Sequence, residues 1–300
     1  MKHRIIVVGA NSYIARNCIA YLGNRCPQAE LCLYDRNATQ IDGYDNYRSL
    51  DVLSSDEVRA IDWNCDAVFM FVGKTGTLNG FDEYDTFIDV NERALLNILD
   101  ACRRQGSRAT VVFPSTRLVY KGSSEPLHED AEKEFKTVYA VTKYACEQYL
   151  QQYHNVFGLN YSIFRICVPY GSVLPGAGSS FGTLGFMVGR AKQHQPITLY
   201  GGGEVRRTLT HVEDICRIMV TGVLENRCVN DVFNIGGDDY SLNEMASIIA
   251  ERFNASVTAV PWPETALKIE SGSTVFADGK LRERGLMPQR HFADWVQELS

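Results

Sequence analysis

A tyrosine and a lysine stand four residues apart in the segment VYAVTKYACEQYL, which spans residues 138–150. On a helix, residues at this spacing share a face, so Tyr139 and Lys143 could contact one ligand. A free phenol, with a pKa of about 10, is a poor base at neutral pH, but a nearby ammonium favours the phenolate. The pair is therefore a candidate proton-transfer site. Two ordinary residues on one side of a helix are the alternative, and the spacing alone does not decide between them.

A second candidate site is the turn in VVGANSYIARN, directly after the first apolar segment. A glycine turn there lets the pyrophosphate of a dinucleotide bind backbone amides at the next helix's N-terminus. Gly9 supplies the tight turn, whereas Ser12 and Ala15 replace the other glycines of the pattern G-x-x-G-x-x-G. Asp35 ends the next apolar segment, where a carboxylate accepts hydrogen bonds from ribose hydroxyls and repels a 2′-phosphate. These residues favour NAD, although Arg36 leaves NADP open, and a solvated Asp–Arg turn is the alternative.

These side chains need a framework, and the first half of the chain supplies a regular one. Apolar, β-branched segments predict buried strands at residues 5–8, 30–34, 67–72, 110–113 and 161–164. Helical patterns lie between them, including residues 13–22, 87–104 and 138–157. Strict alternation predicts an α/β fold of the Rossmann type, with a doubly wound parallel sheet between two layers of helices.

The alternation ends after Arg165. Residues 169–185 are rich in Gly, Pro and Ser and predict a loop. The segments that follow predict a helix at 186–194, a turn at 200–203, a helix at 212–224 and a strand at 232–235. Ser241 and Glu244 have the spacing of a capping box, which predicts a helix that runs to residue 253.

This change of pattern predicts two parts of unequal size. Residues 1–167 are expected to form an NAD-binding Rossmann domain, to which segments around 208–236 return. Residues 168–300 are expected to form a smaller, mixed α/β substrate-binding lobe. No segment has the composition of a linker for independent domain motion.

Composition excludes several classes of protein. The 300 residues carry a formal net charge of −6, which argues against a nucleic-acid partner because such proteins show a basic stripe. No apolar run approaches the ~20 residues of a membrane helix, and the stretch after Arg4 is shorter than the ~7 residues of a signal-peptide core. We therefore expect a cytoplasmic protein without a membrane partner. The nine cysteines are scattered and not grouped with histidine, which predicts free thiols and no metal site.

The order of these motifs resembles the extended short-chain dehydrogenase/reductase family, and within it the nucleotide-sugar epimerases and dehydratases. The matching segments are the Gly9 turn, Asp35, STRLVY, YAVTK, FRICVPYG and LYGGGEVRRTLTHVEDI. The last two are similar to the family patterns R-x-x-N-x-Y-G and Y-G-x-G-x-x-x-R-x-x-x-x-V-x-D. The resemblance implies a nucleotide-sugar substrate, and a homodimer packed through the helices at 87–104 and 138–157.

The resemblance also implies roles for single residues. Thr116, Tyr139 and Lys143 would form the catalytic set: Tyr139 would accept the proton of a sugar hydroxyl as hydride moves to NAD, and Thr116 would hydrogen-bond the same oxygen. The residues implied to bind the cofactor are Gly9, Asn11, Ser12, Tyr13, Ile14, Asp35, Arg36, Asp51, Val52, Phe71, Val72, Gly73, Asn91, Ser115, Tyr139, Lys143 and Ile166. Those implied to bind substrate are Arg117, Val168, Gly182, Tyr200, Arg207 and Lys268, of which Arg207 would grip the diphosphate.

Several positions depart from the family's pattern. Arg117 and Leu118 stand where dehydratases carry an Asp–Glu pair, and leucine cannot transfer a proton, so 4,6-dehydration is not expected. Val168 replaces an asparagine that contacts substrate, and Lys268 stands for a second diphosphate-binding arginine. Arg117 suggests a sugar with a carboxylate or another anionic group, with a surface arginine as the alternative. His211 occupies an aromatic packing position and is expected to be structural.

We therefore expect an NAD-dependent nucleotide-sugar epimerase that acts at C4 of a UDP- or dTDP-hexose by transient oxidation to a 4-keto sugar. An NAD(P)H-dependent reductase of a 4-keto-6-deoxy nucleotide sugar is the nearest alternative. Asp35 favours the epimerase, whereas Arg36 and the incomplete glycine pattern favour the reductase. A non-catalytic dinucleotide-binding sensor is a third possibility, which the intact Thr116, Tyr139 and Lys143 oppose.

Overall fold

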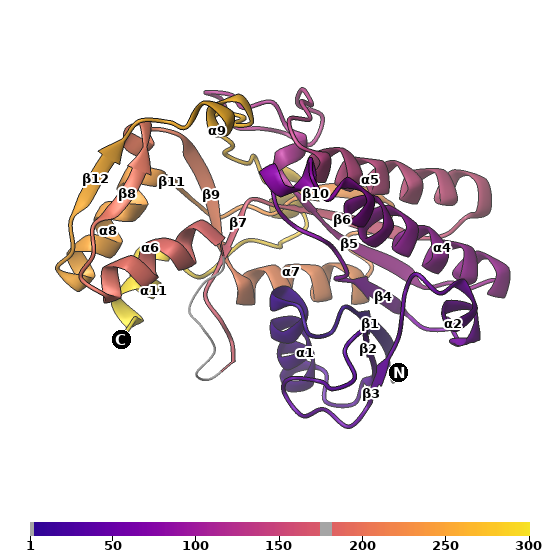
Figure 1. The fold of residues 1–300 in the computed structure, drawn as a ribbon. Helices are drawn as coiled ribbons and strands as arrows, with labels where there is room; N and C mark the ends of the chain where they lie inside the picture. The colour runs from indigo at the N-terminus through magenta and orange to yellow at the C-terminus, as the bar shows by residue number, and fades with distance from the viewer. Residues whose placement is uncertain (1–2, 175–181) are drawn as a thin grey trace.

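A seven-stranded sheet forms the larger part of the computed structural model, which describes residues 3–174 and 182–300 (Figure 1). Its strand order is β10-β6-β5-β4-β1-β2-β3, and each neighbouring pair is parallel. The strands are β1 (Arg4–Val8), β2 (Glu30–Asp35), β3 (Tyr47–Ser49), β4 (Ala67–Met70), β5 (Thr110–Thr116), β6 (Tyr161–Ile166) and β10 (Asp231–Asn234). This arrangement confirms the predicted Rossmann-type sheet, whose strand order reverses between β1 and β4.

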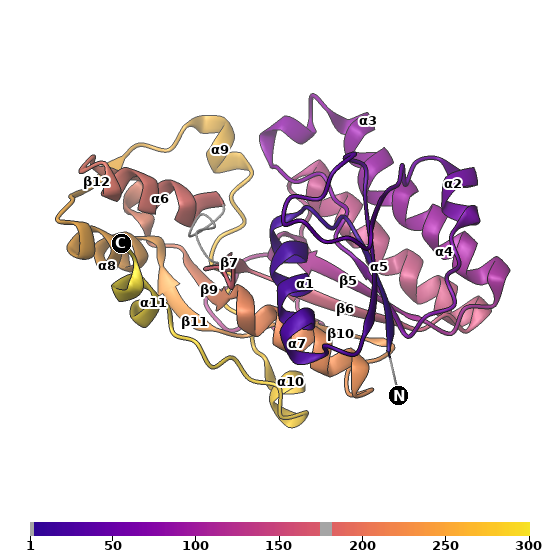
Figure 2. The same ribbon diagram turned by 90° about the horizontal axis from the view of Figure 1, so that it is seen from below.

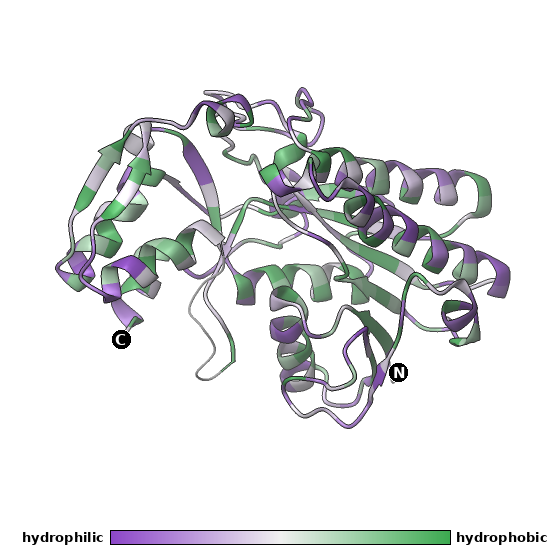
Figure 3. Cartoon of the chain, in the orientation of Figure 1, coloured by the Kyte–Doolittle hydropathy of each residue, from purple (hydrophilic) through white to green (hydrophobic). Residues whose placement is uncertain are grey.

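Helices cover both faces of this sheet (Figures 1 and 2). One face packs on α1 (Tyr13–Arg25) and α7 (Val212–Leu224), and the other on α2 (Ser55–Ala60), α4 (Ala94–Gln105) and α5 (Val138–Phe157). Along β1, Ile5 and Val7 enter the first of these cores and Ile6 and Val8 the second, as the period of two requires. Because both faces of these strands are buried, their sequences are continuous runs of apolar residues. Figure 3 shows the hydrophobic residues concentrated in these strands and in α7.

The segment before α4 is less regular than its sequence pattern predicted. A short helix, α3 (Tyr84–Phe87), leads into the π-helical stretch η2 (Ile88–Arg93), and only then does α4 begin. A π-helical turn shifts the side chains that follow it by one position, and such turns are frequent at functional sites. Asn91 lies within this stretch and is buried.

The smaller lobe contains two further sheets. One has the order β11-β9-β7, from β7 (Val168–Tyr170), β9 (Arg206–His211) and β11 (Asp238–Ser241), and the other pairs β8 (Ile197–Tyr200) with β12 (Val257–Val260). The helices α6 (Gly182–Lys192), α8 (Leu242–Phe253) and α11 (Phe292–Glu298) pack on them around a separate core. The remaining helices, α9 (Glu264–Lys268) and α10 (Gly279–Glu283), lie outside that core. The capping box at Ser241 is present, and α8 ends at Phe253 as predicted.

The predicted loop at residues 169–185 is wrong at both ends. Its first residues belong to β7, which pairs with β9, and α6 begins at Gly182. Residues 175–181 lie outside the described part of the chain. The sequence pattern missed β7 because a strand of three residues carries no periodic signal, and its partner strand is distant in the chain.

The chain crosses between the two parts more than once. Helix α7 and strand β10 return to the large sheet, and Leu281 of α10 joins the core that α1 and α7 form with it. Within residues 3–174 and 182–300, no helix combines the length and apolarity that a membrane crossing needs. All nine cysteines are free thiols.

His211 links the lobe to the large sheet, and its environment predicts how stability depends on pH. It ends β9 and caps α7, where its Nδ1 accepts a hydrogen bond from the amide of Glu213 at 3.2 Å. Its ring meets the ring of Tyr170 edge-on at 5.2 Å. Burial lowers the pKa of His211 from 6.5 to about 4, so the folded protein keeps the ring neutral while the unfolded chain takes up a proton.

We expect the free energy of unfolding to fall as the pH drops from 6.5 to 4, by up to about 3 kcal/mol from His211 alone. His211→Asn keeps a cap acceptor but removes the titrating ring, so its stability should change less over this range. Urea unfolding of both proteins at pH 7, 6, 5 and 4 measures the difference. Equal pH dependence in the two proteins would contradict this assignment.

Candidate active site

Tyr139 and Lys143 reach the carboxyl edge of the sheet because of how α5 begins. Thr137 caps this helix, and its Oγ1 accepts a hydrogen bond from the amide of Ala140 at 3.1 Å. Tyr139 therefore lies in the first turn and Lys143 one turn later, beside Thr116 at the end of β5. The structure brings all three predicted catalytic residues to one cavity.

This sheet-edge cavity has a volume of about 380 Å³. Its lining residues are Ser12, Tyr13, Ile14, Phe71, Val72, Gly73, Thr75, Pro114, Ser115, Thr116, Tyr139, Lys143, Ile166, Cys167 and Pro169. Most of the residues predicted to bind a cofactor are among them. The cavity lies over the carboxyl ends of β1, β4, β5 and β6, where α/β folds of this kind bind ligands.

Burial shifts the pKa values of Tyr139 and Lys143. It lowers the pKa of Lys143 to about 8, while Nζ of Lys143 lies 3.7 Å from the centre of the Phe113 ring. Burial also raises the pKa of Tyr139 to about 12, against a hydrogen bond with Thr116 that lowers it. Without a ligand, burial outweighs the hydrogen bond with Thr116 and keeps Tyr139 protonated. That the ammonium of Lys143, together with the positive nicotinamide ring, favours the phenolate stays a prediction for the site with NAD bound.

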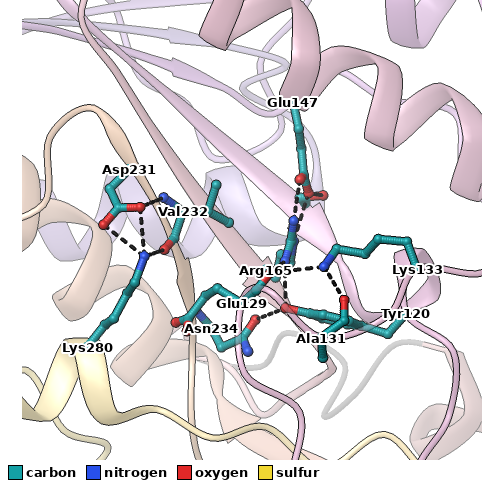
Figure 4. Close-up of polar contacts among 11 residues, drawn as sticks. Tyr120, Glu129, Ala131, Lys133, Glu147, Arg165, Asp231, Val232, Asn234 and Lys280 are labelled. Carbon is teal, nitrogen blue, oxygen red and sulfur yellow. Dashed lines mark hydrogen bonds and ion pairs between the residues drawn. The ribbon is translucent and has the colours of Figure 1, made fainter.

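A buried cluster of polar side chains anchors α5 to the sheet, and Figure 4 labels four of its members, Tyr120, Glu147, Arg165 and Asn234. The carboxylate of Glu147 pairs with the guanidinium of Arg165 on β6, at 2.6 Å and 3.0 Å, and accepts a hydrogen bond from Ser115 Oγ. Arg165 also donates to the hydroxyl of Tyr120 at 2.6 Å, which donates to Asn234 Oδ1 on β10 at 2.7 Å. We call these five residues the buried cluster. It ties α5 to β5, β6 and β10.

Sequence reasoning missed Glu147, although a signal was present. Glu147 lies one helical turn beyond Lys143 and therefore on the same, inward face of α5. A carboxylate on a buried face needs a cation. Burial alone would lower the pKa of Arg165, but the hydrogen bonds and the charge of Glu147 raise it overall.

The glycine turn follows β1 and lies against the residues that directly follow the neighbouring strand β4. Gly9 has φ +84°, and a Cβ there would lie 2.7 Å from the backbone of Phe71 and Val72, so only glycine fits. Ser12 occupies the N-cap position of α1. Its Oγ is buried but makes no hydrogen bond in the described part of the chain. An unpaired hydroxyl at the N-terminus of a 13-residue helix, facing a cavity, fits the pyrophosphate of NAD.

The predicted ribose and adenine contacts lie beyond this cavity, at the edge of the sheet. Asp35 ends β2, and its carboxylate accepts hydrogen bonds from the amides of Asn11 at 3.1 Å and Asn37 at 3.2 Å. These bonds hold the carboxylate beside the Gly9 turn. Arg36 is exposed, and so is Asp51, whereas its neighbour Val52 is buried between the sheet and α2.

Asn91 lies behind the wall of the sheet-edge cavity. Its Oδ1 accepts from the amide of Lys74 at 2.7 Å, and its Nδ2 donates to Thr142 Oγ1 at 2.9 Å. It thus connects the segment after β4 to α5, beside the lining residue Gly73. Asn91 lies within the π-helical stretch η2, and its side chain is buried.

A second cavity, of about 510 Å³, opens between the large sheet and the smaller lobe. Its lining residues are Thr77, Arg117, Leu118, Val168, Gly182, Thr183, Leu184, Phe186, Met187, Thr198, Leu199, Tyr200, Arg207, Leu242, Met245, Trp262, Ala266, Ile269, Glu270 and Ser271. Five of the six residues predicted to bind substrate are present. Trp262, Glu270 and Ser271 were missed, because they come from an irregular segment without a recognised motif.

Lys268 is the predicted substrate residue that the structure does not bring to this interlobe cavity. Its side chain is 70% exposed on α9 and pairs with Glu264 at 2.6 Å, one turn away. Arg207, in contrast, is buried in the cavity wall. It pairs with Glu270 at 2.7 Å and donates to the carbonyl of Gly272 at 2.6 Å.

The two cavities adjoin. Thr116 lines the sheet-edge cavity, and the next residue, Arg117, lines the interlobe cavity. Similarly, Val168 lines the interlobe cavity, whereas its neighbours Cys167 and Pro169 line the sheet-edge cavity. A ligand that fills the interlobe cavity can therefore present one end to Thr116 and Tyr139. The arrangement suits a transfer of hydrogen between two molecules bound side by side, with a buried phenol to exchange the proton.

Comparison with known proteins gives consistent matches. A family model described as the NAD dependent epimerase/dehydratase family matches residues 5–236. The UDP-glucuronate 4-epimerase of Thermodesulfobacterium geofontis is 26% identical over 190 residues, which cover 62% of this chain and 57% of that protein. The CDP-paratose 2-epimerase of Salmonella typhi is 24% identical over 63% of each chain, so the match spans less than two thirds of both relatives. The GDP-6-deoxy-D-mannose reductase of Pseudomonas aeruginosa is 24% identical over 90% of this chain and 86% of that protein.

Solved structures share the whole fold. The UDP-glucose 4-epimerase of Thermus thermophilus, in complex with NAD, has a TM-score of 0.84 and 22% identity, covering 98% of this chain and 96% of that one. The UDP-glucose 4-epimerase of Thermotoga maritima, with UDP-glucose, has a TM-score of 0.84 and 18% identity over the same shares. At these identities the likeness establishes the fold.

The unpaired hydroxyl of Ser12 predicts opposite effects on ligand binding and on stability. Ser12→Ala should weaken NAD binding by roughly 5- to 10-fold, the contribution of one hydrogen bond, as measured by calorimetry. The melting temperature of the ligand-free variant should stay equal or rise, because a buried hydroxyl without a partner is lost.

Ser54→Ala is the matched control for Ser12→Ala. Ser54 caps α2 and accepts from the amide of Glu57, so this change should lower stability and leave NAD affinity unchanged. An NAD affinity of Ser12→Ala equal to that of the unchanged protein would remove Ser12 from the cofactor site.

Proposed function

Because the chain belongs to the NAD dependent epimerase/dehydratase family, we propose that it is a nucleotide-sugar epimerase acting at C4 of a UDP- or dTDP-hexose. The reaction would pass through a transient 4-keto sugar. The observation that carries this proposal is the meeting of Thr116, Tyr139 and Lys143 in one cavity that adjoins the larger interlobe cavity. Residues 168–300 would then act mainly as the substrate-binding lobe, with α7 and β10 completing the NAD-binding domain.

NAD, the family's cofactor, supplies a reversible hydride acceptor when bound. Tyr139 would accept the proton of the C4 hydroxyl and return it to the same oxygen after the keto sugar has turned over. Thr116 would hydrogen-bond that oxygen and hold it within reach of the phenol. The raised pKa of Tyr139 suits the second half of the cycle, because a protonated phenol can donate to the keto oxygen.

The position of Lys143 suits a supporting role in this cycle. With a pKa near 8 it changes charge close to neutral pH, and its ammonium would stabilise the phenolate while the proton is away. Leu118 lines the interlobe cavity but has no group that can transfer a proton, which is why we do not propose dehydration.

A reductase of a 4-keto-6-deoxy nucleotide sugar is the second candidate. It is favoured by the alignment with a GDP-6-deoxy-D-mannose reductase, which extends over 90% of the chain. It would use the same three residues in one direction and release oxidised cofactor. Asp35, oriented by the amides of Asn11 and Asn37, opposes a 2′-phosphate and so supports NAD and the epimerase.

The function is tested by incubating the purified protein with NAD and UDP- or dTDP-hexoses and separating the C4 epimers. Tyr139→Phe should lower the rate by roughly 100- to 10,000-fold with an unchanged melting temperature, because only the proton acceptor is lost. Tyr144→Phe, on the same helix but outside both cavities, is the control and should keep full activity. Full activity of Tyr139→Phe would refute the mechanism. Net consumption of NADH or NADPH with a 4-keto sugar, without epimer exchange, would establish the reductase instead.

We also propose a cytoplasmic homodimer. Free thiols in all nine cysteines suit a reducing compartment. Apolar side chains are exposed along α3, η2 and α5, which pack together; Tyr84 is 53%, Ile88 42% and Val141 50% exposed. A second copy of the chain that packs on these helices would cover them.

Ile88→Glu should convert the dimer to a monomer, because a dimer would bury two unpaired carboxylates at the interface. Light scattering during gel filtration measures the mass of each species. Ile41→Glu places the same charge on an exposed residue beyond β2 and should remain dimeric. A monomeric parent protein would refute the dimer.

A further inference from the structure

We infer that the sugar bound by this protein carries a carboxylate, and that Arg117 binds it. The inference rests on the proposed function, since it takes the reacting hydroxyl to lie at Thr116 and Tyr139. It adds a substrate class, the nucleotide-linked hexuronates, and a residue that selects for it. The argument starts from the charges around the interlobe cavity.

Arg117 occupies the boundary between the two cavities. It is the first residue of η3 (Arg117–Val119), directly after Thr116, whose Oγ1 accepts from the amide of Leu118 at 3.2 Å. This bond fixes the turn that carries Arg117 into the wall of the interlobe cavity. The other cation among the described residues of that wall, Arg207, is distant in the chain from Thr116, Tyr139 and Lys143.

The charges of this wall do not balance. Arg207 and Arg117 are both cations, and among the described residues that line the cavity only Glu270 is a carboxylate. Glu270 pairs with Arg207 at 2.7 Å. Among the described residues, none forms an ion pair with Arg117, and the one hydrogen bond of its side chain goes to Ser271 Oγ at 3.5 Å.

Burial and the charge of Arg207 both act on Arg117. They lower its pKa to about 10, against the charge of Glu270, which raises it, and Arg117 stays charged at neutral pH. A partly buried guanidinium without a counter-ion is unfavourable unless a ligand supplies the negative charge. Its planar fork matches a carboxylate through two parallel hydrogen bonds.

A nucleotide sugar offers two anionic positions, and the two arginines differ in which of them already has a counter-ion. Arg207 is held by Glu270 and by the carbonyl of Gly272, at the lobe side of the cavity, and would face the diphosphate. Arg117 follows Thr116 in the chain and would face the sugar ring near the reacting C4. The next ring carbon, C5, carries the exocyclic group, and in a hexuronate this group is a carboxylate.

The test is a set of binding measurements on the NAD-loaded protein with UDP, UDP-glucose and UDP-glucuronate, and with the dTDP series. The unchanged protein should bind the glucuronate at least 10-fold more tightly than the glucose compound, as one charge-assisted pair contributes. Arg117→Met should abolish this preference while its affinity for the free nucleotide and the glucose compound stays the same. Arg117→Lys should retain part of it. Thermal melting shows whether each variant is folded.

Arg207→Met is the matched control, and it should weaken all three ligands of a series equally. An equal loss for all three in Arg117→Met would overturn the inference and assign Arg117 to the diphosphate. Equal affinity of the unchanged protein for the glucose and glucuronate compounds would overturn it as well. Failure to bind any free nucleotide would instead refute the proposed function on which the inference rests.

Discussion

The buried ion pair between Glu147 and Arg165 is the constraint on which the active site depends. Both side chains are almost fully buried, at 0% and 3% exposure, and either one alone would be an uncompensated charge in the core. Through Ser115 and Tyr120 the pair also reaches β5 and β10. Such a pair adds little net stability, but it permits only one placement of α5 on the sheet. Tyr139 lies two turns and Lys143 one turn before Glu147 on the same helix, so the placement of α5 also fixes where these two side chains lie.

The order of strands decides what faces these two groups. Because the sheet reverses between β1 and β4, the Gly9 turn and the carboxyl end of β5 open onto the same edge. The chain at the end of β5 contributes neighbouring residues to two adjoining cavities. Thr116 belongs to the cavity that suits NAD, and Arg117 to the cavity of the smaller lobe. One residue step thus separates the cavity to which we assign proton transfer in our proposal from the cavity to which we assign substrate binding.

Burial affects the ionisable side chains of the two cavities differently. In the sheet-edge cavity it moves the pKa of Tyr139 upward, which keeps the phenol protonated, and that of Lys143 downward to about 8, which brings its titration close to neutral pH. In the interlobe cavity, the guanidinium of Arg117 stays charged although burial lowers its pKa to about 10. The first environment suits a group that exchanges a proton, and the second suits a permanent receptor for anions.

The sequence by itself determined what depends on neighbours along the chain. The bounds of α5 and α7, the capping box at Ser241 and the shared face of Tyr139 and Lys143 follow from periodicity and capping, which are local. Only the tertiary structure decided the pairing of Glu147 with Arg165, the unpaired hydroxyl of Ser12 and the distance of Lys268 from the cavity. These depend on contacts between segments far apart in the chain, and on how deeply each side chain is buried. Neither quantity is encoded in local spacing.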